Sequence, residues 1–335
     1  MSMIRKSFAA LTIVAGAVGA LGATAAHAAD YPSQAIRVIV PFAPGGSTDI
    51  VARIVSQRMA QELGQPVVVE NKGGAGGAIG AAEAARAKPD GYTLSIATVS
   101  TLAVNPACRP DDLPYDALND FVPVTNFANV PNVIEANPKF PAENFKDMVK
   151  ELKANPGKYS YGSSGTCGIL HLFGEAFKLS TGTDAIHVPY TGSGPAVTDA
   201  VGGQINLMFD NLPSSIAQIQ AGNLRPLAVA WPERLASLPD VPTLAEEGYP
   251  ELNQPVWYGL LAPKGTPPEI VTKLRDAAVV ALKDPAVLDT LDKQGAAPSG
   301  NTPEEFAKEI KTQYDWAKDV VAKGHITLNS DTLLS

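Results

Sequence analysis

The sequence predicts an α/β protein of two lobes, each a mostly parallel sheet flanked by helices. Two observations carry this prediction. Segments rich in β-branched residues alternate with amphipathic segments, a rhythm that favours parallel strands covered by helices. The rhythm stops near the middle of the chain and starts again, and one late strand returns to the first unit. We therefore expect residues 29–128 with 254–335 in one lobe and 129–253 in the other, joined by two crossings with a cleft between them. A single doubly wound domain is the alternative.

The first expected elements are a strand at 36–41 and a helix whose apolar residues recur at helical spacing from Ile50 to Leu63. A glycine turn at 73–77 then leads into an Ala-rich helix that ends near Arg86. Further strands are expected at 66–70, 92–97, 121–127, 132–136, 158–161, 185–189, 205–209, 226–229 and 257–262. Helices are expected between them at 144–153, 169–180, 195–201 and 213–221, and a Pro-rich irregular stretch at 231–255.

The last part of the chain is helical, and two Thr-Pro-x-Glu sequences predict where its helices begin. Thr266-Pro267-Pro268-Glu269 has the form of a capping box with proline at the first helical position. Thr302-Pro303-Glu304-Glu305 repeats the pattern before a helix that runs to about Lys323.

Residues 1–28 have the pattern of a secretory signal. Arg5 and Lys6 give a positive start, an apolar segment follows from Phe8 to about Ala20, and Ala26-His27-Ala28 is a cleavage site of the A-x-A type. A retained N-terminal anchor is the alternative. Export to the bacterial periplasm is therefore expected, and the remaining roughly 300 residues suffice for one large or two medium domains.

Charge and composition exclude several classes of partner. The chain has 26 Lys and Arg against 34 Asp and Glu, a net charge of −8. Loss of the two basic residues of the signal makes it about −10, and no basic run exists, so nucleic acid and anionic membranes are not expected partners. His171, His187 and His325 are scattered, and no Cys/His pair has the spacing of metal ligands. We expect neither a metal nor a cofactor.

Two cysteines remain, Cys108 and Cys167. An even pair in an oxidising compartment favours a disulfide, and two buried thiols are the alternative. A bridge that closes about 58 residues stabilises by roughly 4 kcal/mol in the chain-entropy view.

Three loops follow strands, begin helices and consist of small polar residues: 42–49, 162–168 and 190–194. Each offers free backbone N–H groups, the positive end of a helix dipole and hydroxyls, and none contains Lys or Arg. Since ligands of open α/β sheets bind at the carboxyl ends of strands, the three loops together predict an anion site. The alternative is that Ser47, Ser163 and Ser193 only cap their helices.

Motifs for nucleotide chemistry are absent, and those for hydrolysis are incomplete. No Gly-Lys-Ser/Thr occurs, and 74–79 approaches G-x-G-x-x-G only with isoleucine as its last residue. Ser163 or Ser164 could still act with His171 or His187, because members of a catalytic triad need only meet in space. A secreted serine hydrolase therefore stays open as an alternative.

Two further residues have alternative roles. Asp210 ends the expected strand 205–209, where a carboxylate would face a ligand, and a helix cap before Pro213 is equally expected. Phe42 either closes one wall of the site or belongs to the core.

In combination, these segments resemble the Bug proteins, the periplasmic solute receptors of tripartite tricarboxylate transporters. The similarity covers essentially the whole chain after the signal, in order. Its segments are Val40-Pro41-Phe42-Ala43-Pro44-Gly45-Gly46-Ser47-Thr48-Asp49, Glu70-Asn71-Lys72-Gly73-Gly74-Ala75-Gly76-Gly77, Pro89-Asp90-Gly91-Tyr92-Thr93-Leu94, Asn105-Pro106, Leu113-Pro114-Tyr115-Asp116, Val188-Pro189-Tyr190, Phe209-Asp210-Asn211, Leu238-Pro239-Asp240-Val241-Pro242-Thr243-Leu244 and Trp257-Tyr258-Gly259. Thr98–Thr101 departs from the usual form, and the cysteine pair is not universal. The joint occurrence of the two cysteines supports a bridge between the rims of the lobes or across the hinge.

The resemblance implies a two-lobed Venus flytrap of type II that closes on a small organic carboxylate without catalysis. Backbone amides and Ser/Thr hydroxyls of both lobes would hold the ligand. The implied site residues are Phe42, Ala43, Gly45, Gly46, Ser47, Thr48, Asp49, Thr101, Ser163, Ser164, Gly165, Thr166, His171, Tyr190, Thr191, Gly192 and Asp210. The implied partners are a di-, tri- or aromatic carboxylate and the membrane subunits of a tripartite transporter, for a protein expected to be monomeric. A receptor used only for signalling is the further alternative.

Overall fold

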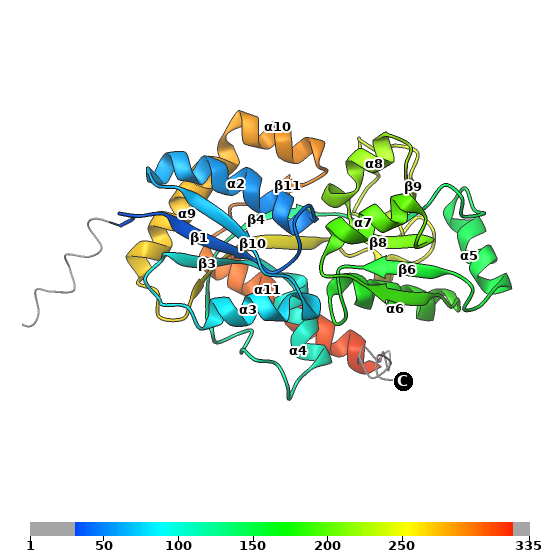
Figure 1. Ribbon diagram of the computed structural model, residues 1–335, viewed down its shortest axis with the longest axis horizontal. Coiled ribbons are helices and arrows are strands. Elements are labelled where there is room, and N and C mark those ends of the chain that lie inside the picture. Colours follow the sequence, from blue (N-terminus) through cyan, green and yellow to red (C-terminus); the bar gives the residue numbers. More distant parts are fainter. Residues whose placement is uncertain (1–30, 324–335) are drawn as a thin grey trace, which may run out of the picture.

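The computed structural model describes residues 31–323, and Figure 1 shows them as two α/β lobes that lie end to end. The expected secretory signal at 1–28 lies outside the described residues. None of the helices between residues 31 and 323 combines the length and the apolar character needed to cross a membrane.

The first lobe is built on a six-stranded mixed sheet. Its strands are β1 (Ile36–Val40), β2 (Val67–Asn71), β3 (Thr93–Thr98), β4 (Phe121–Val130), β10 (Val256–Pro263) and β11 (Ala297–Pro298). They lie in the order β11-β4-β10-β3-β1-β2. β1 pairs in parallel with β2 and β3, whereas β10 runs antiparallel to both β3 and β4.

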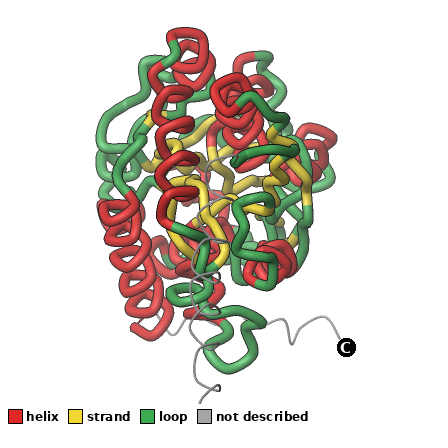
Figure 2. The backbone as a smooth tube through the Cα atoms, turned by 90° about the vertical axis from the view of Figure 1, so that its left-hand side faces the viewer, coloured by secondary structure: helices red, strands yellow, loops and turns green. Residues whose placement is uncertain are grey.

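Helices cover both faces of this sheet (Figure 2). They are α2 (Ser47–Leu63), α3 (Ala78–Ala85), α4 (Asn105–Cys108), α9 (Pro268–Lys283), α10 (Pro285–Lys293) and α11 (Pro303–Lys323), with short helical turns at Ala75–Gly77 and Ser100–Val104. The expected stripe of α2 faces the sheet, since Val51, Val55 and Met59 are buried in the core of this lobe. α2 ends at Gly64, whose φ of 67° is the left-handed conformation that glycine adopts at low cost.

The second lobe has a five-stranded sheet with an apolar cluster on each face. Its strands are β5 (Asn132–Ala136), β6 (Ser160–Ser163), β7 (Ile186–Pro189), β8 (Leu207–Asn211) and β9 (Arg225–Ala230), in the order β7-β6-β8-β5-β9. Its helices are α5 (Phe145–Ala154), α6 (Ile169–Thr181), α7 (Ser193–Gly202) and α8 (Ile216–Gln220), with turns at Leu212–Ser214 and Pro250–Leu252.

The predicted α/β fold of two lobes is confirmed, but its sheets contain more antiparallel pairing than expected. β5 and β10 each run against their neighbours. The reason is that both strands follow a crossing between the lobes, so they enter their sheets from the end where the neighbouring strands stop. Sheet membership changes between Val130 and Asn132 and again between Ala230 and Val256. The two crossings are adjacent, because the Asn132 side-chain amide donates to the Gln254 carbonyl at 2.7 Å.

The two predicted capping boxes differ in outcome. Thr302 and Glu305 form the predicted box: the Thr302 N–H donates to the Glu305 carboxylate at 2.8 Å, and the Glu305 N–H donates to the Thr302 hydroxyl at 3.1 Å. The box at Thr266 is wrong: α9 is preceded by Pro267, and the Thr266 hydroxyl donates to the Pro263 carbonyl at 2.8 Å. The prediction of proline at the first helical position is confirmed by Pro268.

Candidate functional site

The N-termini of two helices, one from each lobe, meet at the junction of the lobes. Gly46 precedes α2 and Gly192 precedes α7, and neither helix has a side-chain hydrogen bond to cap it. The two ends are close, since a Cβ added to Gly46 would lie 3.4 Å from the Ser193 nitrogen. Each end presents unpaired N–H groups and a partial positive charge. Two such ends that face each other favour an anion between them.

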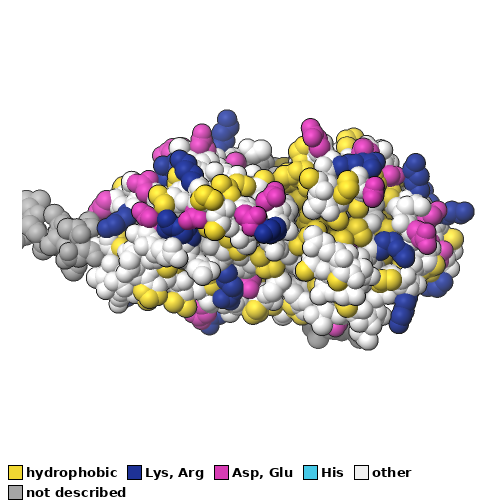
Figure 3. Space-filling model, turned by 90° about the horizontal axis from the view of Figure 1, so that it is seen from above, with side chains coloured by type: hydrophobic (Ala, Val, Ile, Leu, Met, Phe, Trp, Pro, Cys, Tyr) yellow, Lys and Arg dark blue, Asp and Glu magenta, His cyan; other side chains and the backbone are white. Residues whose placement is uncertain are grey.

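The space between these ends is small and lined by uncharged groups. Its volume is about 10 Å³, on the order of what one water needs. The lining residues are Phe42, Gly46, Ser47, Thr48, Thr98, Val99, Ser100, Ser164, Ile169, Ser193, Asn211, Val256 and Tyr258. An organic carboxylate therefore requires the lobes to part further than they do here. Charged side chains of both signs are scattered over the outside of both lobes, as Figure 3 shows from the α2 side.

Backbone contacts hold the lobes together around this space. The Ala43 N–H donates to the Thr191 carbonyl at 3.0 Å. A Cβ added to Gly194 would lie 2.2 Å from the Pro44 carbonyl oxygen, and one added to Gly76 would lie 2.4 Å from the Thr166 oxygen. Only residues without a side chain permit this approach, so glycine at these positions sets how closely the lobes can meet.

Ser47 links the two lobes instead of capping α2. Its hydroxyl donates to the Asn211 carbonyl at 2.7 Å and accepts the Ser214 N–H at 2.9 Å. Tyr258 adds a bond from its hydroxyl to Asn211 Oδ1 at 2.7 Å. The alternative in which Ser47 is only a helix cap is therefore wrong, because Gly46 occupies the cap position.

Asp49 stabilises the first loop and does not line the central space. Its carboxylate accepts the Gly45 N–H at 3.0 Å, the Arg53 guanidinium at 2.9 Å and the Asn71 amide at 2.9 Å. Burial alone would raise the pKa of Asp49, but these hydrogen bonds outweigh it and keep the pKa below its usual value. The carboxylate thus fixes the loop while Arg53 balances its charge.

Asp210 lies beneath the site and is paired with a second buried carboxyl. Burial raises the pKa of Asp210 to about 6, although hydrogen bonds from Ser193 and Ser214 lower it in part. Burial, and after it the charge of Asp210, raises the pKa of Glu135 well above its usual value. Neither carboxyl oxygen of Glu135 makes a hydrogen bond of normal geometry. Burial and the neighbouring Asp210 thus both favour the protonated form of Glu135.

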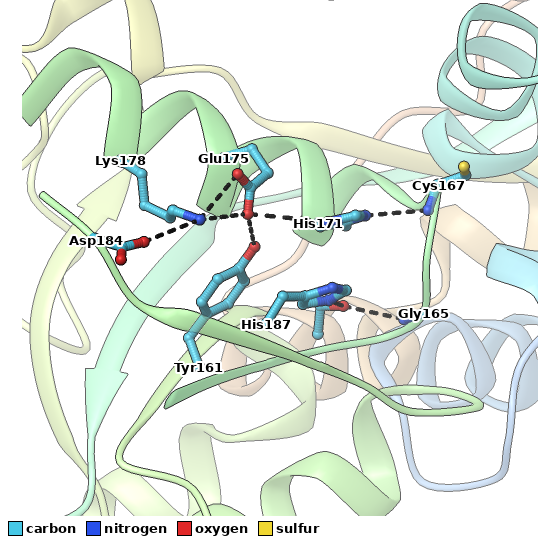
Figure 4. Close-up of polar contacts among 9 residues, drawn as sticks. Tyr161, Gly165, Cys167, His171, Glu175, Lys178, Asp184 and His187 are labelled. Carbon is cyan, nitrogen blue, oxygen red and sulfur yellow. Dashed lines mark hydrogen bonds and ion pairs between the residues drawn. The ribbon is translucent and has the colours of Figure 1, made fainter. Parts of the chain in front are cut away.

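Two stacked histidines support the loop at 162–168 (Figure 4). The rings of His171 and His187 are 3.8 Å apart. His187 Nε2 meets Ser163 Oγ at 2.6 Å, and that hydroxyl also accepts the Gly165 N–H at 3.2 Å. The Cys167 N–H donates to His171 Nδ1 at 3.3 Å. The histidines therefore fix the backbone of the loop from behind.

Burial keeps both histidines neutral. It lowers the pKa of His171 to about 4, while Glu175 opposes the shift. The pKa of His187 falls to about 3, first through burial and then through the nearby His171. A neutral His171 is required by its role as acceptor. A weakly basic His187 beside the fully buried Ser163 is poorly suited to activate a nucleophile.

The predicted site residues fall into three groups. Those that line the central space are Phe42, Gly46, Ser47, Thr48 and Ser164. Those at the contact between lobes or at its mouth are Ala43, Gly45, Gly165, Thr166, Tyr190, Thr191 and Gly192. Those behind the loops are Asp49, Thr101, Ser163, His171 and Asp210, none of which lines the space. Ligand contacts of all three groups stay predictions.

Sequence reasoning missed several lining residues, above all Ser100, Asn211 and Tyr258. Asn211 directly follows the candidate Asp210, and Tyr258 belongs to an expected strand, but no local pattern marks either as a cleft residue. Ser100 lies in a helical turn that was not expected at all.

Cys108 and Cys167 form a disulfide with a Cα–Cα distance of 5.9 Å. Cys108 ends α4 in the first lobe, and Cys167 lies between β6 and α6 in the second, so the bond joins the lobes. Over residues 31–323, no cluster of three or more His, Cys, Asp or Glu is arranged to hold a metal ion.

Comparison with known proteins places this geometry among transport receptors. Residues 51–325 match the "tripartite tricarboxylate transporter family receptor" description. Protein BugT of Bordetella pertussis is 40% identical over 319 residues, which cover 93% of this chain and 98% of BugT. A solved structure described as a periplasmic transporter is 76% identical, with a TM-score of 0.89 over 89% of this chain and 100% of that one.

Two further solved structures carry organic acids. Rpa4515 of R. palustris, solved with adipate, is 34% identical with a TM-score of 0.85 over 89% of this chain and 99% of its own. MatC of Rhodopseudomonas palustris, solved with bound malate, is 33% identical with a TM-score of 0.83, and the match covers 87% of this chain and 100% of MatC.

Proposed function

The chain belongs to the tripartite tricarboxylate transporter receptor family, and on that premise we propose that it is a periplasmic receptor for a small organic carboxylate. The lobes close on the ligand and present it to the membrane subunits of a tripartite transporter. The protein acts as a monomer and performs no catalysis on its ligand. Its expected secretory signal supports the periplasmic location.

The observation that carries this proposal is the meeting of two helix N-termini at a space lined by hydroxyls and amides. An ionised carboxylate there accepts hydrogen bonds from α2 in one lobe and α7 in the other. Hydrogen bonds to a charged acceptor are the stronger kind, and exclusion of water on closure strengthens them further. Because the ligand bonds to both lobes, its binding energy drives closure.

The class of ligand is supported by relatives whose structures contain adipate or malate, both of which are dicarboxylates. One carboxylate would occupy the space between α2 and α7. The other would extend toward the mouth, a depression of about 440 Å³ lined by both lobes. Arg109 is the cation among the residues that line this depression. A second carboxylate near Arg109 would find the formal charge that the inner space does not offer.

Hydrolysis is the competing function, because Ser163 lies 2.6 Å from His187. The buried position of Ser163 and the low pKa of His187 argue against it. Labelling with a fluorophosphonate distinguishes the two functions: a receptor stays unlabelled, and stoichiometric labelling of Ser163 contradicts our proposal.

A thermal-shift screen over di-, tri- and aromatic carboxylates tests the binding function. A ligand that binds only the folded protein must raise the midpoint of unfolding. For the carboxylate with the largest shift, we expect Ser47→Ala to weaken binding, because it removes a hydroxyl that lines the proposed site.

Ser56→Ala is the matched control for this substitution. Ser56 lies in the same helix, is buried, and its hydroxyl makes no hydrogen bond. We expect S56A to bind like the unmodified protein. If no carboxylate of a broad panel shifts the midpoint, or if S47A and S56A bind alike, the proposed site is wrong.

A further inference from the structure

The two long edges of the cleft are built differently. Figure 1 shows α4 and α6 on the lower side of the sheets and α2 and α7 on the upper side. At the lower edge, which we name the α4/α6 edge, the Cys108–Cys167 disulfide joins the lobes covalently. At the upper edge, named the α2/α7 edge, the lobes meet through backbone and hydroxyl groups such as those of Ser47 and Ser214.

The α4/α6 edge is also sealed by apolar packing. Cys167 and the first residues of α6, although they belong to the second lobe, are buried in the apolar core of the first. Ile169, Leu170 and Leu172 all have exposures of 7% or less. The Ile169 N–H donates to Ser100 Oγ of the first lobe at 2.9 Å. Separating this edge would expose apolar side chains to water, whereas the groups of the α2/α7 edge exchange their partners for water at little cost.

The disulfide adds a third covalent connection between the lobes. The other two are the adjacent crossings at 130–132 and 254–256, which together define one hinge. Cα atoms of a disulfide stay within about 7 Å of each other. Since Cys108 and Cys167 are already 5.9 Å apart, the α4/α6 edge can widen by only about 1 Å while the bond is intact.

We propose that the disulfide turns the α4/α6 edge into part of the hinge, so that the cleft opens only at the α2/α7 edge and ligand enters there. This inference rests on the proposed function for the identity of the ligand, but not for the motion itself. A one-sided opening exposes the N-termini of α2 and α7 while the loop that carries Ser164 stays attached to the first lobe. Loss of the disulfide permits the wider opening of two lobes joined by the crossings alone.

Two amides report on the two edges separately, because each makes its hydrogen bond across the junction. The Ala43 N–H bonds to Thr191 near the α2/α7 edge, and the Ile169 N–H bonds to Ser100 at the α4/α6 edge. Hydrogen exchange, followed by NMR on the protein without added ligand, measures how often each bond opens. The Arg37 N–H, which bonds to Tyr92 within the first lobe, monitors unfolding of that lobe.

In the oxidised protein we expect Ala43 to exchange faster than Ile169 by roughly tenfold or more. In the variant C108S/C167S we expect Ile169 to exchange roughly tenfold faster than in the oxidised protein, a larger change than at Arg37. If the double variant does not fold, the same comparison uses the unmodified protein reduced by excess dithiothreitol, a dithiol that becomes a cyclic disulfide as both cysteines become thiols.

Equal exchange of Ile169 with and without the disulfide, after correction for Arg37, overturns the proposal. This result is independent of the carboxylate site. Adding adipate or malate then tests that site: a changed exchange rate at Ala43 supports it, and unchanged exchange at Ala43 with both acids counts against it while leaving the edge comparison intact.

Discussion

Substitution of Gly194 by alanine separates closure of the lobes from their stability. Gly194 is the second residue of α7, and the added methyl group would lie 2.2 Å from the Pro44 carbonyl oxygen of the other lobe. Ordinary contact begins near 3.4 Å, so the lobes must stop about 1 Å short of their present approach. At that separation, the bonds of Ala43 and Ser47 across the junction are stretched beyond useful length.

The expected loss can be worked from those bonds. Three of them cross here: Ala43 to Thr191 and the two made by the Ser47 hydroxyl. At about 1 kcal/mol net for each, the present closed arrangement loses about 3 kcal/mol, and because a carboxylate competes with these bonds, its apparent affinity rises by up to roughly 100-fold. Each lobe keeps its own core, because the clash lies between the lobes and Gly194 belongs to the first turn of α7.

Isothermal titration with the best carboxylate of the screen, together with urea unfolding, measures both effects. Gly202→Ala is the matched control, because Gly202 ends the same helix and an added Cβ there meets nothing within 4 Å. We expect G202A to keep full affinity. Equal affinities of G194A and G202A refute the reasoning that close approach of these backbones competes with binding.

Three further predictions concern stability. The raised pKa of Glu135 makes the unmodified protein lose stability as pH rises above about 4.5, the usual pKa of the carboxyl. Glu135→Leu removes this loss, so the variant gains stability relative to the unmodified protein as pH rises. Urea unfolding of both proteins over a range of pH measures the difference, and a difference that does not grow with pH contradicts the prediction. His171 and His187 act in the opposite direction, because their pKa values are lowered to about 4 and about 3. Their contribution to stability is complete above about pH 6.5 and declines below it, by up to about 1.4 kcal/mol per pH unit for each histidine. In H187F we expect a shallower decline of the unfolding free energy with falling pH. Thr302→Ala costs about 1 kcal/mol through its lost cap, whereas Thr312→Ala in the same helix, where the hydroxyl only bonds back to its own helix, costs little in thermal unfolding.

The sequence predicted the parts of the cleft that are local. The strand before Phe42, the glycines after it and the helix from Ser47 are all encoded within 14 residues, so the strand, loop and helix start were recognisable from their pattern. The start of α6 was likewise placed at Ile169. Pattern and propensity act over such short distances, which is why these elements could be anticipated.

The partners across the cleft could not be predicted in the same way. Ser47 bonds to Asn211, which lies 164 residues further along the chain. Glu135 belongs to an expected strand, but nothing in the period of that strand indicates that both faces of its sheet are covered and that the carboxyl is buried. The turn at Ser100–Val104 was missed because its residues, Ser-Thr-Leu-Ala-Val, carry neither a cap nor a helical stripe. These features depend on which elements meet in space.

The uncharged lining of the cleft has a consequence for how the receptor exchanges its ligand. Were Lys or Arg to supply the binding energy, bringing the lobes this close would bury an unpaired charge at a cost of several kcal/mol. Hydroxyls and amides can instead bond to one another across the junction, as Ser47 and Ser214 do, so the lobes can approach to a space of about 10 Å³. Ligand then competes with these internal bonds, and the fraction of molecules open at the α2/α7 edge scales the apparent affinity. In our proposal the Cys108–Cys167 bond acts on this same fraction, because it restricts the open state and lies outside the residues that line the space between α2 and α7.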